Sequence, residues 1–202
     1  MKKVLKKRDS RKRILKAALN EIRLKGFQSA NINIITKKSG LTKGALYYYF
    51  KNKRELGYAV VDMLKQDMLD DVWIQPLKTC DDPISCIQSI INNDSEQMTI
   101  KEIRLGSPLI DLAVEMTPLD INFKQRFDLI RETWIKSITD SLERGKQQKV
   151  VNNDVDSRKI AIHLLAFLMG SRALAKGAQS MELFLDCQAR LIEFLESLRS
   201  SH

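Results

Sequence analysis

The chain has 202 residues, of which 44% are hydrophobic and 29% charged, a composition typical of folded proteins that excludes wholesale disorder. Its 8 Gly and 4 Pro are few, which favours long helices over a turn-rich β-sandwich. The longest apolar stretches, such as residues 161–170, are shorter than the roughly 20 residues that cross a bilayer. No apolar segment of the signal-peptide kind follows the Lys-rich start, so we expect a cytoplasmic protein with no membrane partner.

Basic residues are concentrated at the front of the chain. Residues 1–55 carry 17 of the 34 Lys and Arg but only 3 of the 25 Asp and Glu, whereas the whole chain has a net charge of +9. The remaining residues are therefore mildly acidic. This asymmetry predicts a front module that binds a polyanion and a rear module that does not.

The residue types of catalytic and metal sites are sparse. The cysteines, Cys80, Cys86 and Cys187, lack the spacing of metal ligands and are expected to stay reduced, and the histidines are His163 and His202. The chain has no His-Glu-x-x-His motif, no Gly-x-Ser-x-Gly motif and no phosphate-binding glycine loop. We therefore expect no enzyme: no catalytic residue, no metal site and no cofactor.

In chain order, the first predicted elements are four helices. Apolar residues at helical spacing predict a helix over 10–25, followed by a short helix over 32–39. The turn Gly40-Leu41-Thr42 separates the latter from a second short helix over 43–49, and a longer helix starts at Lys53 and continues to about Leu69. Two short helices around a turn that opens with Gly are typical of a helix-turn-helix.

The rear of the chain also has the pattern of helices. Five are predicted, over 83–98, 105–115, 119–144, 157–176 and 181–199, and no strand-like alternation stands out. These patterns predict an all-α protein with a helix-turn-helix near its N-terminus.

One segment carries a specific resemblance. The resemblance is carried by Gly26-Phe27, by the run Gly40-Leu41-Thr42-Lys43-Gly44-Ala45-Leu46-Tyr47-Tyr48-Tyr49-Phe50, and by Lys53. With these residues the segment resembles the N-terminal domain of the TetR family of transcriptional regulators. The resemblance implies an N-terminal three-helix DNA-binding domain with a helix-turn-helix over 8–68, a larger helical effector-binding and dimerisation domain over 69–202, and a homodimer. Family members generally repress transcription and leave double-stranded operator DNA when a small-molecule effector binds. The chain departs from the family at Ile34 and Thr36, where a polar residue and Ala are usual, and we expect Ile34 to pack against the first helix.

The second helix of a helix-turn-helix enters the major groove with its N-terminal residues against base edges. Here Thr42 can cap that helix or reach a phosphate, and Lys43 can donate to guanine O6 and N7. Gly44 permits close approach of the backbone, and Ala45 can touch a thymine methyl group. Because the start of this helix has few long side chains that could contact bases, DNA shape is expected to supply part of the specificity.

Further contacts are expected at the phosphates. The hydroxyls of Tyr47, Tyr48 and Tyr49 suit phosphate oxygens, and the family resemblance implies this role for Tyr47 and Lys53. Asn31 and Asn33 are expected to add backbone contacts through the start of the preceding helix. Basic residues at the start of the chain are expected to form either a flexible arm that reaches neighbouring phosphates or a solvated tail: Lys2, Lys3, Lys6, Lys7 and Arg8.

The rear domain offers candidates for the effector pocket and for the dimer interface. Aromatic, sulfur and imidazole side chains predict the pocket at Trp73, Met116, Phe127, Trp134, His163 and Phe167. Small and apolar side chains on the last two helices predict the interface at Ala166, Gly170, Ala173, Leu183, Leu191 and Phe194. Packing inside one chain is compatible with both patterns. The alternatives to a ligand-released repressor are a sequence-tolerant DNA-organising protein and a ligand-dependent activator.

Overall fold

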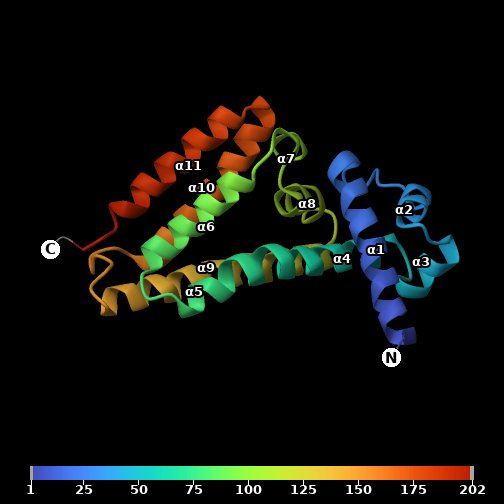
Figure 1. Ribbon diagram of the computed structural model, residues 1–202, viewed down its shortest axis with the longest axis horizontal. Coiled ribbons are helices and arrows are strands. Elements are labelled where there is room, and N and C mark those ends of the chain that lie inside the picture. The colour runs from blue at the N-terminus through green and yellow to red at the C-terminus, as the bar shows by residue number, and fades with distance from the viewer. Residues whose placement is uncertain (1, 201–202) are drawn as a thin grey trace. The chain divides into compact units, whose positions relative to one another are not determined.

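The structure, a computed structural model, describes the backbone of residues 2–200 and the side chains of residues 9–200. All regular secondary structure in this range is helical. The only pairing of extended backbone within it is an isolated bridge between Val151 and Arg199. The prediction of an all-α protein is thus confirmed. The helices, shown in Figure 1, are α1 (Lys2–Lys25), α2 (Ile32–Ser39), α3 (Lys43–Tyr49), α4 (Lys53–Leu64), η1 (Lys65–Ile74), α5 (Gln75–Thr79), α6 (Pro83–Gln97), α7 (Ile100–Leu105), α8 (Pro108–Met116), α9 (Ile121–Gln147), α10 (Ser157–Ala178) and α11 (Met181–Glu196).

The two short helices lie at their predicted bounds because each is capped locally. The Asn31 side chain accepts a hydrogen bond from the N–H of Asn33 (2.8 Å) and so caps the start of α2. Gly40 ends α2 in the left-handed conformation, with φ +65°, which suits a residue without Cβ. The first helix differs from its prediction, since α1 begins at Lys2 and includes the segment expected to be a flexible arm. The side chains of that arm lie outside the described residues.

The predicted helix over 105–115 is wrong at its start. Leu105 ends α7, Gly106 takes φ +74°, and α8 begins at Pro108. Pro favours the first position of a helix, where its missing N–H costs nothing, and a positive φ at Gly106 cannot belong to a right-handed helix. The helix from Lys53 also changes character, because α4 gives way to the π-helix η1 at Lys65.

By packing, the chain forms two compact units, unit 1 with residues 1–65 and 108–127 and unit 2 with residues 66–107 and 128–202. In unit 1, α1 packs on α2, α3 and α4, and α8 packs on α1 and α4 (Figure 1). Buried apolar side chains from these helices form its core, including Ile14, Ile35, Leu46, Leu56 and Leu112. The predicted domains 8–68 and 69–202 are contiguous, whereas this unit takes in 108–127 from the rear of the chain.

Aromatic packing explains why residues 108–127 belong to unit 1. The fully buried ring of Phe123 contacts the rings of Phe27 and Tyr58 edge to face, with centroids 5.2 and 4.8 Å away. The Tyr58 hydroxyl donates to the Asp120 carboxylate (2.9 and 3.0 Å), and burial together with this hydrogen bond raises the pKa of Tyr58. The sequence period of each helix gives no information about this long-range contact.

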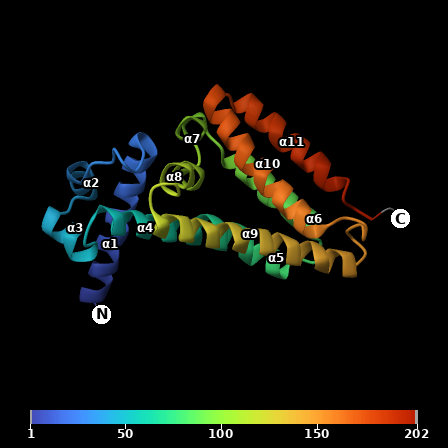
Figure 2. The same cartoon turned by 180° about the vertical axis from the view of Figure 1, so that it is seen from behind.

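In unit 2, α10 packs on α11 and α7, and α11 packs on α6, so that α6, α10 and α11 lie side by side in both views (Figure 2). Charged pairs tie these helices together. Arg172 of α10 bonds to Asp94 of α6, and Arg199 donates to Asp82 (2.9 Å), which also caps α6 through the N–H of Ser85.

Helix α10 revises one expectation from the sequence. The helix has 22 residues, and an 18-residue window of it has a mean hydropathy of 1.3, so it is long and apolar enough to cross a membrane, by length and composition alone. This is weak evidence for a membrane, since core helices of soluble proteins have the same properties. One side of α10, including Leu164, Leu165 and Leu168, is buried in unit 2.

Candidate nucleic-acid interface

The start of α3 is the exposed part of the helix-turn-helix. The Thr42 hydroxyl accepts a hydrogen bond from the N–H of Ala45 (3.1 Å), so its cap role is observed in the structure. Lys43 and Gly44 are exposed, and Ala45 is half-buried. Among residues 9–200, apart from the chain neighbours of Gly44 and the backbone of its own helix, only the Thr42 hydroxyl lies within 4 Å of a Cβ built at Gly44 (3.9 Å). This end of α3 therefore offers its backbone for close approach.

The three tyrosines of α3 divide between solvent and the interior. Tyr47 and Tyr48 are 43% and 68% exposed, unusual values for such large side chains, whereas Tyr49 is half-buried. The rings of Tyr48 and Tyr49 contact each other edge to face, with centroids 5.2 Å apart. Leu46 and Phe50, four residues apart, are buried and fix α3 to the core.

Helix α2 presents its first turn to solvent. Asn31 and Asn33 are exposed, and the Asn31 side chain is already engaged in the cap. Ile34, which the sequence places at a possible interface with the first helix, is 39% exposed and so only partly covered. Thr36 is buried, and its hydroxyl donates to the Asn33 carbonyl (2.9 Å), which satisfies the extra polar group that replaces the usual Ala.

Lys53 stands at the start of α4 and is held by the turn between α1 and α2. Its ammonium donates to the Gln28 carbonyl (2.8 Å) and lies 5.3 Å from the centre of the Phe27 ring. Burial lowers the pKa of Lys53, while the nearby charge of Glu115 opposes that change. Lys53 therefore has a fixed position in the DNA-free protein.

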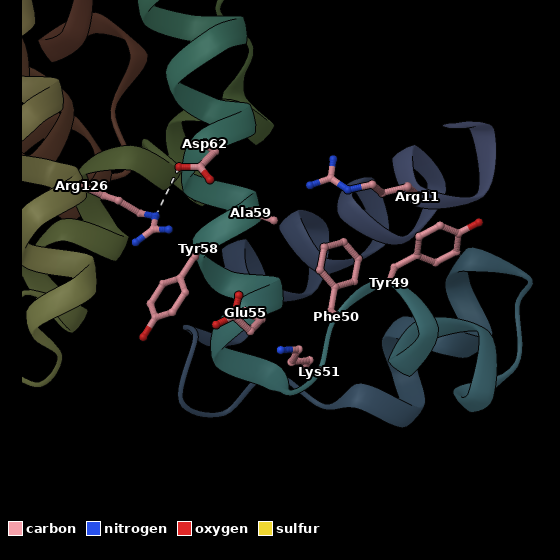
Figure 3. Close-up of a pocket in the computed structure, with 9 residues that line it drawn as sticks. All are labelled: Arg11, Tyr49, Phe50, Lys51, Glu55, Tyr58, Ala59, Asp62 and Arg126. Carbon is pink, nitrogen blue, oxygen red and sulfur yellow. Dashed lines mark ion pairs between the residues drawn. The ribbon is translucent and has the colours of Figure 1, made fainter. Parts of the chain in front are cut away.

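A hollow of about 340 Å³ lies beside α3 in unit 1 (Figure 3). It is lined in part by basic residues that are not among the predicted DNA contacts. Arg11 lies over the Phe50 ring at 5.4 Å, and Lys51, which also lines the hollow, is exposed. Arg126 lies over Tyr58 at 4.5 Å and pairs with Asp62 at 3.3 Å. The basic run at the start of α1 was the available signal for Arg11, but no local pattern indicates that it lies near Phe50.

The predicted effector residues are divided between the two units. Met116 and Phe127 are buried in unit 1, whereas Trp73, Trp134, His163 and Phe167 belong to unit 2. In unit 2 the rings of Trp73 and Trp134 meet edge to face, with centroids 5.2 Å apart. His163, expected in the interior, is exposed, with the Phe194 ring 4.6 Å away.

The predicted interface residues are mostly at the surface of unit 2. Ala166, Gly170 and Ala173 are exposed along one stripe of α10, and Leu183 and Phe194 are half-buried on α11. Leu191 is 1% exposed, which contradicts a role in contacting a second chain. Its position on the inner side of α11 makes it part of the core of unit 2.

The fold and the exposed helix-turn-helix define a DNA-binding regulator of the helix-turn-helix class. Residues 14–60 match the family model described as bacterial regulatory proteins, tetR family. Residues 14–60 therefore form a DNA-binding domain of the kind found in this family, and the chain resembles TetR-family helix-turn-helix transcriptional regulators.

Similar proteins agree with this assignment. The regulator LmrA of Bacillus subtilis is 34% identical over 108 residues, which cover 53% of this chain and 57% of LmrA. A helix-turn-helix regulator encoded in the lacX 3′ region of Lactococcus lactis is 25% identical over 86% of this chain and 87% of its own length. A TetR regulator from Chloroflexus aurantiacus has the same fold, with a TM-score of 0.81 at 19% identity over 97% of this chain and 99% of that one. The chain thus spans little more than half the length of LmrA in this match.

Proposed function

We propose that the protein is a homodimeric transcriptional repressor that binds operator DNA through α3 and leaves it when a small molecule binds the helical rear of the chain. The role is non-enzymatic and belongs to the cytoplasm, where the chromosome is. The observation that carries the proposal is the exposed start of α3, where Lys43 and Gly44 have open access to a partner.

Base reading is assigned to the start of α3. Lys43 is exposed there, next to Gly44, and its ammonium can donate to guanine O6 and N7 in the major groove. Ala45 can contact a thymine methyl group. Such a small reading surface makes DNA shape a second source of specificity.

Phosphate contacts are assigned to Tyr47, Tyr48, Tyr49 and Lys53, with Asn31 and Asn33 at the start of α2. An ammonium group has three N–H donors, and the Gln28 carbonyl takes one of those of Lys53, so two remain for a phosphate. The Tyr47 hydroxyl is part of a side chain that is 43% exposed and can donate in the same way.

Dimer formation is assigned to the exposed stripe of α10 and the adjoining surface of α11. Ala166, Gly170 and Ala173 permit another helix to approach closely, and Leu174, which is 55% exposed, adds apolar area. A symmetric dimer places its two reading helices about 34–36 Å apart, the distance between successive major grooves. Leu183 and Phe194 extend the same surface.

Effector binding is assigned to the neighbourhood of Trp73 and Trp134. The indole Nε1 of Trp134 is buried and has no hydrogen-bond partner within residues 9–200. A buried donor without a partner costs free energy, which a ligand with an acceptor atom would recover. His163 and Phe167, on α10 of the same unit, are further candidates.

The test compares DNA binding of two lysine variants at several salt concentrations, on the DNA upstream of the protein's own gene and on random DNA. Lys53→Ala should weaken binding to both and lower the log–log salt slope by about one. Lys43→Ala should relax base preference at one or two positions, by about 1–3 kcal/mol. Equal binding of wild-type protein to both DNAs at physiological salt would favour the DNA-organising alternative.

The effector half of the proposal has its own test. Compounds are screened for release of the protein from its upstream DNA, and each hit is titrated with and without that DNA. Effector and operator should weaken each other's binding by the same factor, with a coupling of about 1–3 kcal/mol. A compound that binds near Trp134 but leaves operator affinity unchanged would contradict release, and one that raises it would favour a ligand-dependent activator.

A further inference from the structure

The turn between α1 and α2 forms a small anion-binding concavity. Gly26 takes φ +77° at the end of α1, and the next two backbone N–H groups, of Phe27 and Gln28, point to one place. Successive amides in such a left-handed turn are a common site for an anion. In this protein the anion is part of the chain itself.

Glu115, in the last turn of α8, occupies this concavity. One carboxylate oxygen accepts from the N–H of Phe27 (2.7 Å) and the other accepts from the N–H of Gln28 (2.8 Å). A Cβ built at Gly26 would come within 3.1 Å of the same carboxylate, and the positive φ also favours Gly at this position. The two hydrogen bonds join residues 88 and 87 positions apart in the sequence.

The same turn holds Lys53. The carbonyl of Gln28 accepts from the Lys53 ammonium (2.8 Å), and the ring of Phe27 lies under that ammonium. The charge of Glu115 acts on Lys53 as well and opposes the effect of burial on its pKa. One carboxylate therefore fixes the backbone that holds Lys53 and supports the charge of Lys53.

We propose that Glu115 is a positioning residue for DNA binding: by bonding to the N–H groups of Phe27 and Gln28, it sets the place from which Lys53 meets a phosphate. This inference rests on the proposed phosphate contact of Lys53. It assigns to α8, which lies far from α4 in the sequence, control over a DNA-contacting side chain. Movement of Glu115 away from the turn would release Lys53 and weaken binding.

The test uses Glu115→Gln, which keeps the shape of the side chain but turns one acceptor into a donor that faces an N–H group. Glu55→Gln is the matched control, because Glu55 is exposed on α4 of the same unit and its substitution removes the same charge. Binding to upstream DNA should fall about 10-fold or more in Glu115→Gln, as expected when charged hydrogen bonds are lost. Glu55→Gln should bind no more weakly than the wild type.

A double substitution separates positioning from a general loss of structure. If Glu115 acts through Lys53, adding Glu115→Gln to Lys53→Ala should cause no further loss of affinity, and both single variants should share the lower salt slope. Glu115→Asp, which keeps the charge but shortens the side chain, should show a smaller loss in the same direction and serves if Glu115→Gln does not fold. Fully additive losses, or wild-type affinity in either Glu115 variant, would overturn the proposal. Failure of the wild-type protein to prefer upstream DNA would instead count against the proposed function.

Discussion

Gly57 gives a direct test of the packing that joins residues 108–127 to the helix-turn-helix. A Cβ at Gly57 would lie 2.8 Å from Cζ of Phe123 and closer still to the ring of Phe27, and both rings are buried. The change Gly57→Ala gains about 0.5–1 kcal/mol of helix preference. Against this, an extra methyl group in a filled core costs about 1–3 kcal/mol. The two rings are held edge to face, so neither can move without disturbing the other.

The net effect of Gly57→Ala should be a loss of about 1–2 kcal/mol in the free energy of unfolding, which for a chain of this size lowers Tm by about 2–4 °C per kcal/mol. Gly177→Ala is the control, since within the described residues no atom lies within 4 Å of a Cβ at this helical position. That variant should be as stable as the wild type or slightly more so. Circular dichroism during urea and thermal unfolding measures both. A Gly57→Ala protein as stable as Gly177→Ala would refute the packing of the two rings around Gly57.

Three further predictions concern unit 2. Asp82→Asn should lower the free energy of unfolding by about 1 kcal/mol, because Asn can still cap α6 but cannot form the ion pair with Arg199. Burial would raise the pKa of Asp82, but hydrogen bonds from Ser85 and Arg199 lower it below 3.8. The stability that the Asp82 carboxylate contributes is therefore present above about pH 4 and is lost as the pH falls. Urea titrations of the wild type and of Asp82→Asn from pH 7 to pH 2 should converge. Burial and the neighbouring Cys80 thiol raise the pKa of Cys86 to about 12. At pH 8, iodoacetamide should therefore label Cys86 far more slowly in the folded protein than in the urea-unfolded protein. Equal labelling rates would contradict the burial of Cys86. Gly170→Ala, where a Cβ would have no atom of residues 9–200 beyond its chain neighbours and its own helix backbone within 4 Å, should be at least as stable to unfolding as the wild-type chain, like Gly177→Ala. It should raise the dimer dissociation constant about 10-fold in sedimentation equilibrium, and an unchanged constant would remove α10 from the interface.

Local sequence determined the helices of the DNA-binding motif. The bounds of α2 and α3 follow from residues within three positions of each helix start, such as Asn31 and Thr42, and from the left-handed Gly40. Hydrogen bonds of this kind depend on the local chain alone, so they can be read from the residues in order. The exposed start of α3 follows in the same way, because the spacing of Leu46 and Phe50 fixes which side of the helix is buried.

Only the tertiary structure decided which segments lie against the motif. Phe27, Gly57 and Phe123 come from three separate helices or turns, and their contact depends on shape and not on any helical period. The contact of Glu115 with the α1–α2 turn could not be predicted from the sequence for the same reason. Nothing in the residues around Glu115, near the end of α8, indicates a partner 87 residues away. A helical pattern gives the side of a helix that is buried, but the identity of its neighbour depends on the fold of the whole chain.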